Sequence, residues 1–174
     1  MSSKDIRPIP VFGSTDELTL AIFREFFKGQ DIHIGTLFSD DLKPPVIICR
    51  KERRSGTVAH SSPDENDLQA AIVAVNTITD GLDADESAEE LQEACRIALV
   101  RAQLTQAMYP NAGSIALITN SSPPSRVSDW ATSTGVVQYS ELPKTLVRYE
   151  AIYRLMIRPP RQSTITNRFL TLAN

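Results

Sequence analysis

The first helix that the sequence predicts lies between residues 14 and 29. Apolar side chains recur there every three or four positions, as one face of an amphipathic helix requires. They are Leu18, Ala21, Ile22, Phe23, Phe26 and Phe27. Ser14 with Glu17 has the spacing of a capping box at its start, and Gly29 is a residue type that often follows a helix.

A second helix is predicted between residues 87 and 108. Ser87 with Glu90 repeats the capping-box spacing, and the acidic residues around this start suit the positive end of a helix dipole. Small and apolar residues on one side would let this helix lie close against a sheet. They are Leu91, Ala94, Cys95, Ala98, Leu99 and Ala102.

Four segments are predicted to be strands. Residues 46–49 and 114–119 are short runs of apolar, largely β-branched residues. Residues 68–79 are apolar on both alternating faces in their middle, which is typical of a strand at the centre of a sheet. Residues 146–158 form the longest strand, which we expect to close the domain at an edge of the sheet.

The two faces of this last strand differ in chemistry. One face is apolar and is expected to join the core; it holds Tyr149, Ala151, Tyr153, Leu155 and Ile157. The opposite face holds Arg148, Glu150, Ile152, Arg154, Met156 and Arg158. Three arginines on one face of a strand need water, an acidic partner or a phosphate. A solvated outer face is the simplest interpretation.

The predicted order is helix, strand, strand, helix, strand, strand. This order favours an α+β fold with a mixed or antiparallel sheet of about four strands and both helices packed on one face. We expect one domain at residues 14–158, between an N-terminal arm (1–13) and a C-terminal arm (159–174). Residues 120–145, rich in Ser, Thr and Pro, are expected to form a long loop.

Charge is distributed unevenly along the chain. The net charge of −3 excludes a generally basic nucleic-acid coat. Residues 80–93 contain seven acidic side chains and no basic one, whereas residues 144–168 contain six basic side chains and one acid, Glu150. These segments can be two solvated surfaces, or they can meet head to tail between copies of the chain, because unlike patches attract and steer association.

The sequence offers no convincing catalytic, cofactor or metal site. His60 stands near Ser61, Ser62 and Asp64, but without the Gly-x-Ser-x-Gly turn of a nucleophilic serine. His33 is best explained by a local hydrogen bond. Two acidic pairs, Asp40-Asp41 and Asp64-Glu65, could bind a hard cation only loosely, since neither resembles an EF-hand loop. We therefore expect a protein that is not an enzyme, without cofactor or bound metal.

Cellular context is indicated by what the chain lacks. No apolar run reaches the roughly 18 residues of a membrane span, and the first residues have no apolar core of a secretion signal. Cys49 and Cys95 are far apart and are expected to be buried thiols of a protein made in a reducing cytoplasm; a disulfide between them is the minority alternative.

The last strand also resembles a known family. Residues 148–158 fit the pattern R-Y-x-x-x-Y-x-[L/V]-x-[L/V/I]-R, which is similar to the final strand of tail terminator proteins of bacteriophages with long, non-contractile tails. The order of the other elements agrees over residues 14–158, and the likeness is greatest to versions from phages of actinobacteria. The long segment 120–145 and the tail 159–174 depart from the family pattern.

The resemblance implies a virion structural protein at the head–tail junction, made in the host cytoplasm. It implies a homohexameric ring that caps the tail tube, contacts the major tail tube protein and the head–tail connector proteins, and lets the genome DNA pass through its lumen without sequence specificity. No membrane contact is implied. Candidate residues of the subunit interface or lumen are Arg50, Arg53, Arg54, Glu86, Glu89, Glu90, Glu93, Arg148, Glu150, Arg154 and Arg158.

Two other interpretations stay open. The chain could be another neck component, either a head-completion or a connector protein. It could also be a small-ligand enzyme or regulatory module of α+β type, which would need a pocket with converging polar groups.

Overall fold

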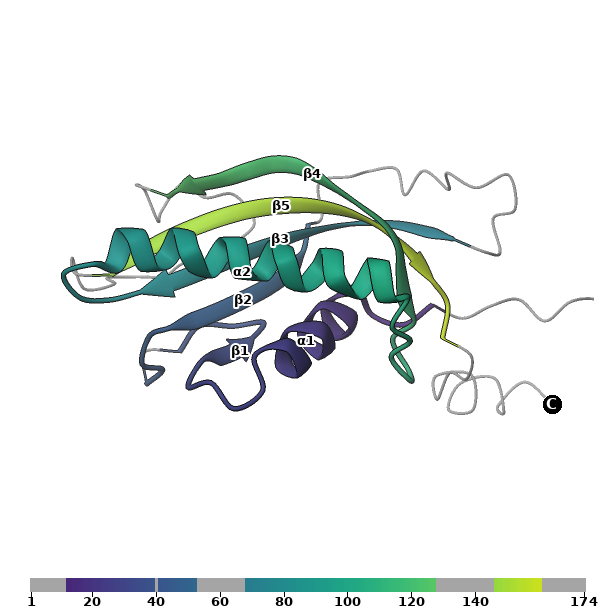
Figure 1. The fold of residues 1–174 in the computed structure, drawn as a ribbon, viewed down its shortest axis with the longest axis horizontal. Coiled ribbons are helices and arrows are strands. Elements are labelled where there is room, and N and C mark those ends of the chain that lie inside the picture. Colours follow the sequence, from purple (N-terminus) through teal and green to yellow (C-terminus); the bar gives the residue numbers. More distant parts are fainter. Residues whose placement is uncertain (1–11, 40, 53–67, 128–145, 161–174) are drawn as a thin grey trace, which may run out of the picture.

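The computed structural model describes residues 12–39, 41–52, 68–127 and 146–160, which form one α+β unit (Figure 1). Its elements in chain order are α1 (Thr15–Phe26), β1 (His33–Gly35), β2 (Val46–Lys51), β3 (Gln69–Thr79), α2 (Ala84–Thr105), β4 (Ser114–Arg126) and β5 (Val147–Arg158). The strands form a sheet in the order β1-β2-β3-β5-β4. Only the β1–β2 pair is parallel, so the predicted mixed sheet is confirmed.

The sheet has five strands where the sequence predicted about four. The additional strand is β1, which pairs its three residues with the start of β2. A strand of three residues is too short to show an alternating pattern, which explains why it escaped prediction. His33 opens this strand and is exposed.

The longest pairing joins β3 to β5. Eleven residues of each strand are paired, from Gln69 opposite Ile157 to Thr79 opposite Val147. The predicted central position of β3 is confirmed, since β2 flanks its other side. The expected edge position of β5 is wrong, because β4 pairs along its second side. The alternation of apolar and polar side chains predicts which face of the sheet each side chain occupies, but it does not predict which strands lie on either side.

Strand β4 is longer than predicted and takes in the first part of the expected loop. It runs on through Pro123 and Pro124 to Arg126, and its register against β5 shifts at three points. Proline lacks the backbone N–H donor, and an edge strand tolerates this loss on its unpaired side. Register shifts are also typical of edge strands. The rest of that expected loop, 128–145, lies outside the described residues, as do residues 1–11 and 161–174 of the two arms.

The helix boundaries agree with prediction at α1 and differ at α2. Ser14 is the N-cap of α1, although its side chain makes no capping hydrogen bond, and Gly29 follows with a φ of 87°. Helix α2 starts at Ala84 with Asp83 as its N-cap, so the predicted start at Ser87 is wrong. The N–H of Ser87 already donates to the carbonyl of Asp83, 2.9 Å away, inside the first turn.

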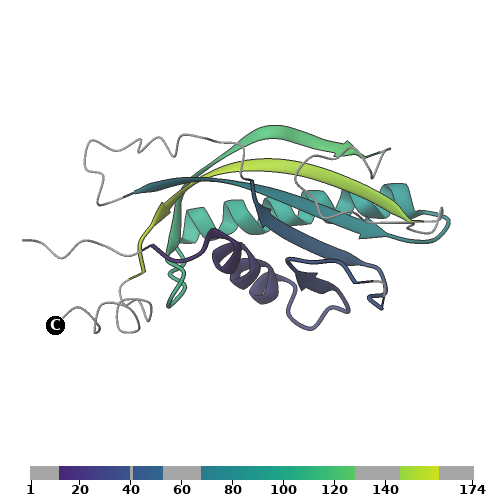
Figure 2. The same cartoon turned by 180° about the vertical axis from the view of Figure 1, so that it is seen from behind.

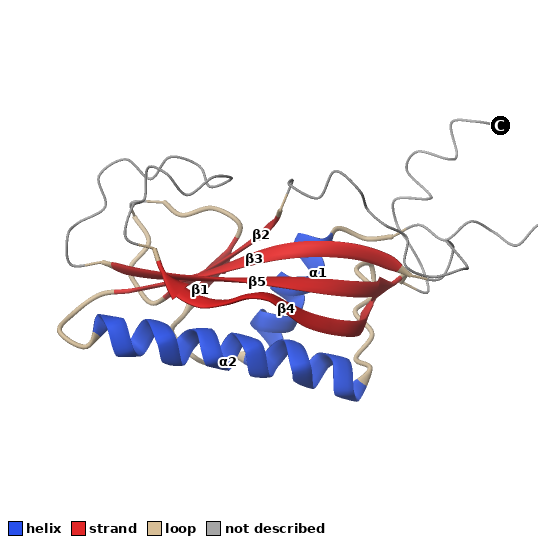
Figure 3. Ribbon diagram, turned by 90° about the horizontal axis from the view of Figure 1, so that it is seen from above, coloured by secondary structure: helices blue, strands red, loops and turns tan. Residues whose placement is uncertain are grey.

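Both helices pack on the same face of the sheet, as predicted. Helix α2 runs along the sheet over β3, β5 and β4, and the shorter α1 lies beside it over β1, β2 and β3 (Figures 1 and 3). The core between them includes Phe23 from α1, Leu99 from α2, and the β5 face predicted to be apolar, of which Tyr149 is half-buried. None of the described helices is long and apolar enough to cross a membrane.

Both cysteines are buried free thiols in this core, as predicted. Burial raises the pKa of the Cys49 thiol and of the Cys95 thiol well above the ordinary range. Each thiol is therefore neutral and poorly reactive in the folded protein, since the thiolate is the nucleophile.

Polar side chains fix the first half of α2 to the sheet. The Thr77 hydroxyl donates to the carbonyl of Ala88 at 3.0 Å, and the Thr79 hydroxyl donates to the carbonyl of Ala84. The amide of Gln92, fully buried, donates to the carbonyls of Val75 and Tyr149 at 2.8 and 3.1 Å. These bonds set the helix position along β3 and β5. Apolar packing holds the second half of α2, together with a hydrogen bond of 3.1 Å from the N–H of Ile118 on β4 to the side-chain oxygen of Gln103.

We predict that Leu99→Ala destabilises the domain by about 2–5 kcal/mol, because it leaves a cavity in the core. The matched control is Leu104→Ala, on the same helix but 75% exposed, where a change within about 0.5 kcal/mol is expected. The free energy of unfolding from urea denaturation measures both. Equal losses at the two positions would contradict the packing described here.

Candidate subunit interface

The alternation of side chains along β5 places Arg148, Arg154 and Arg158 on the face of the sheet opposite the helices. Figure 2 shows the sheet with α2 behind it. At one end of this face, Val46, Ile48 and Ile78 form a small second core, with Phe38, Leu42 and Leu146 packed against it. Arg148 lies beside this cluster, paired across the ladder with Ile78.

Arg148 is a buried structural residue. Only 1% of its surface is exposed, and its Nε donates to Oδ1 of Asn76 at 2.7 Å. Its guanidinium also forms an ion pair with Glu150, with 2.8 Å between Nη2 and Oε2. The expectation that Arg148 faces neighbours or DNA is therefore wrong. The strands on both sides of β5 and the small second core enclose a side chain that the sequence pattern placed in solvent.

Glu150 serves the same internal network. Its side chain is 22% exposed, and the residue pairs with Asn76 on β3 and with Ser125 on β4. The buried guanidinium of Arg148 needs an ion-pair partner and hydrogen bonds to offset its desolvation, and Glu150 and Asn76 supply them. Neither member of the ion pair is well placed to bind another subunit.

Arg154 and Arg158 are exposed, as predicted. Arg154 is paired with Ile72 on β3 and Thr119 on β4, and the guanidinium of Arg158 donates to the side-chain oxygen of Gln106, just after α2. Arg50 is half-buried on β2. Arg53 and Arg54 lie outside the described residues.

Apolar side chains accompany the two exposed arginines. Leu117 is 50% exposed on the edge strand and pairs with the half-buried Met156. We call this end of the open sheet the arginine face, defined by Ile72, Leu117, Ile152, Arg154, Met156 and Arg158. A mixture of exposed apolar groups and arginine is characteristic of protein interfaces.

A second exposed surface follows the outer side of α2. Glu86, Glu90, Glu93, Ile97, Arg101 and Leu104 recur every three or four residues, opposite the buried stripe, and we call them the acidic helix face. Ile97 and Leu104 are 45% and 75% exposed. The glutamates were predicted from the sequence, whereas these two apolar residues stand out only once the buried stripe of the helix is known.

Local ion pairs lie on and beside the acidic helix face. Glu93 forms a salt bridge with Arg96 at 2.6 Å, which lowers the pKa of Glu93. Asp85 pairs with Arg126 of β4 at 3.1 Å. Partial burial, together with the negative charges of Asp85 and Glu89, raises the pKa of Tyr149 on β5. Glu89 is exposed on this flank of α2.

The two faces lie on opposite sides of the domain. The arginine face belongs to the open side of the sheet, and the acidic helix face lies on the far side of the helix layer (Figures 2 and 3). If these two faces bind each other, the acidic helix face of one copy contacts the arginine face of the next. Such a head-to-tail contact is heterologous.

The described residues contain no group of three or more His, Cys, Asp or Glu side chains placed to hold a metal ion. His60, Ser61, Ser62 and the acidic pair 64–65 lie outside the described residues, as does Asp40, so the expectations about them stay untested.

We predict that Arg148→Met lowers the free energy of unfolding by about 3 kcal/mol, because it leaves Glu150 and Asn76 without their partner in a buried site. Arg154→Met, on the same strand and face, is the matched control and is expected to change stability by less than about 0.5 kcal/mol. Chemical denaturation of both variants is the measurement. A harmless Arg148→Met would show that the arginine is not held as described.

Comparison with known proteins assigns no family to the chain. No protein-family model matches it, and no curated protein has a significantly similar sequence. What the two faces do must therefore be inferred from their residues and from the resemblance of the last strand.

Proposed function

We propose that this chain is a virion structural protein of a long-tailed phage, a tail terminator that forms a ring on the tail tube and joins it to the head connector. The observation that carries the proposal is the placement of two unlike exposed faces on opposite sides of the domain, one on the sheet and one on the helix layer. The resemblance of the β5 sequence to terminator proteins supports the choice of this assembly over other rings.

The proposed mechanism of assembly is geometric. The acidic helix face of one subunit contacts the arginine face of the next, and a heterologous contact with a fixed rotation closes into a ring after a whole number of subunits. Opposite charges steer the encounter and set the register, while Ile97, Leu104 and Leu117 supply the apolar area. The resemblance implies six subunits.

The ring has two further contacts in this proposal. One surface of the ring matches the end of the tube and stops its growth, and the other receives the connector proteins. Genome DNA passes through the lumen without sequence-specific contacts. This role depends on shape and needs no catalytic group, cofactor or metal.

We predict that Arg154→Glu with Arg158→Glu weakens self-association at least tenfold, because like charges then oppose each other at the contact. Glu86→Lys with Glu90→Lys is expected to weaken it similarly, and the combination of all four changes to restore part of the association. Sedimentation velocity of the purified protein at low salt measures the distribution of assemblies.

The control for this experiment is Lys28→Glu with Lys51→Glu. These residues are exposed and lie outside both faces, and the pair changes net charge by the same amount as the arginine pair. Loss of assembly in the control alone, or no loss in either face variant, would overturn the proposed contact.

A second experiment separates the terminator from another neck component. A terminator added to polymerising tube protein of the same virus should bind the tube end and stop elongation. A connector or head-completion protein should leave tube growth unchanged and bind the portal side instead. Electron microscopy of tube length distributions provides the measurement.

A further inference from the structure

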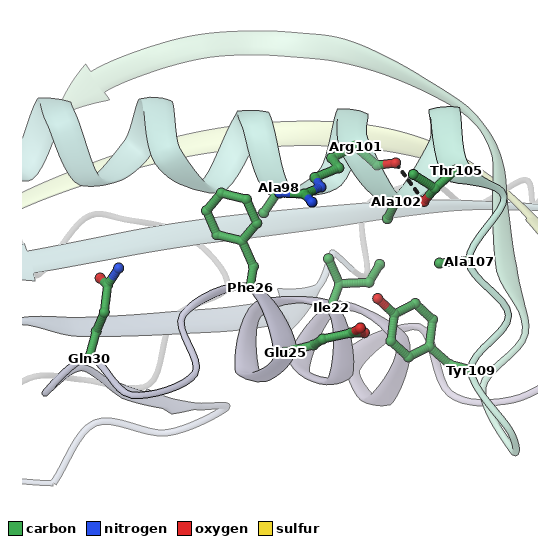
Figure 4. Close-up of a pocket in the computed structure, with 10 residues that line it drawn as sticks. All are labelled: Ile22, Glu25, Phe26, Gln30, Ala98, Arg101, Ala102, Thr105, Ala107 and Tyr109. Carbon is green, nitrogen blue, oxygen red and sulfur yellow. Dashed lines mark hydrogen bonds between the residues drawn. The ribbon is translucent and has the colours of Figure 1, made fainter.

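A cavity opens between the second half of α2 and the end of α1 (Figure 4). Its volume is about 380 Å³, within the range of pockets that bind ligands. The walls are apolar where the helices face each other, at Ile22, Phe26, Ala98 and Ala102. Both helices also contribute charged groups to its lining, Glu25 from α1 and Arg101 from α2.

The end of β5 lies beside this cavity. Arg158, the last residue of the strand, donates to Gln106 immediately after α2, and the cavity is lined at that end by Ala107 and Tyr109. Gly113 is packed so closely under the backbone of Arg158 that a Cβ would meet its carbonyl oxygen. The last described residue, Pro160, is buried. The chain therefore continues from a fixed point next to the cavity.

The segment that follows has the composition to fill such a cavity. Residues 161–174 contain an apolar cluster, Phe169, Leu170 and Leu172, which is preceded by Arg168 and by a separate apolar residue, Ile165. Eight extended residues from Arg161 to Arg168 reach roughly 26 Å. The part of α2 that lines the cavity, from Ala98 to Thr105, spans only about 10 Å at the rise of an α-helix. The length of the segment is ample for Phe169 to reach any part of the cavity.

One charged group of the cavity lining, Glu25, suits the same segment. Glu25 is an exposed carboxylate at the cavity and points toward the hydroxyl of Tyr109 (Figure 4). Burial and the neighbouring Glu25 raise the pKa of this tyrosine. An arginine that enters beside these two groups finds an opposite charge at Glu25, so the basic residue must enter on this side and away from Arg101, which also lines the cavity.

We propose that the C-terminal segment 161–174 docks into this cavity of its own chain, with Phe169 and Leu170 on the apolar walls and Arg168 beside Glu25. Docking within one chain is favoured over docking from a second copy because a short tether keeps the segment at an effective concentration in the millimolar range. The docked segment covers the groove between the helices and joins α1 to α2.

A disulfide-trapping experiment on the full chain tests this proposal. Thr105→Cys combined with Leu170→Cys should form an internal disulfide under mild oxidation, because both positions then meet at the cavity. The native Cys49 and Cys95 are buried and do not compete. The matched control pairs Leu170→Cys with Ser87→Cys, which is exposed on the same helix about 27 Å away from position 105.

The expected result is crosslinking at least tenfold faster at position 105 than at position 87, in a product of monomer mass whose linked peptides are identified by mass spectrometry. Added Glu25→Arg should slow this crosslinking, and Arg168→Glu in the same chain should restore it. Equal rates at the two helix positions would overturn the proposal. Crosslinks only between chains would overturn docking within one chain and assign the groove to a second copy.

Discussion

The eleven-residue pairing of β3 with β5 is the constraint on which the rest of this domain depends. It places two long strands at the middle of the sheet. Along each strand, successive side chains alternate between the helix side and the open side of the sheet. The hydrogen bonds from Thr77 and Gln92 then set α2 against this pair of strands. The positions of the arginine face and the acidic helix face both follow from this β3–β5 pairing.

The same register explains why the arginines of β5 serve different purposes. It brings Arg148 level with Ile78 and next to Asn76, where strands on both sides and the small second core enclose the side chain. Six residues further on, Arg154 lies opposite Ile72 and is exposed. One buried arginine therefore ties β3 to β5, Arg154 remains for contacts outside the domain, and Arg158 is exposed but donates to Gln106 within it.

The fold class, both helices and the four longer strands could be predicted from the sequence because each shows a clear period of apolar side chains. The neighbours of β5 could not, since the pattern of a strand records its two faces and not its two edges. Three-residue β1 carries too little pattern, and Pro123-Pro124 hid the continuation of β4 because proline usually ends a strand. Of the candidate site residues, the glutamates of α2 and two arginines are exposed as expected. The burial of Arg148 and the exposure of Ile97 and Leu104 depend on packing between distant segments.

The central claim is that unlike faces on opposite sides of the domain close a ring of identical subunits. Electron microscopy of the purified full chain, with the subunits counted in averaged top views, tests this claim most directly. Closed rings of six subunits in a head-to-tail arrangement are the expected result. A monomer, or a dimer with twofold symmetry in which the same face meets itself, would contradict the account.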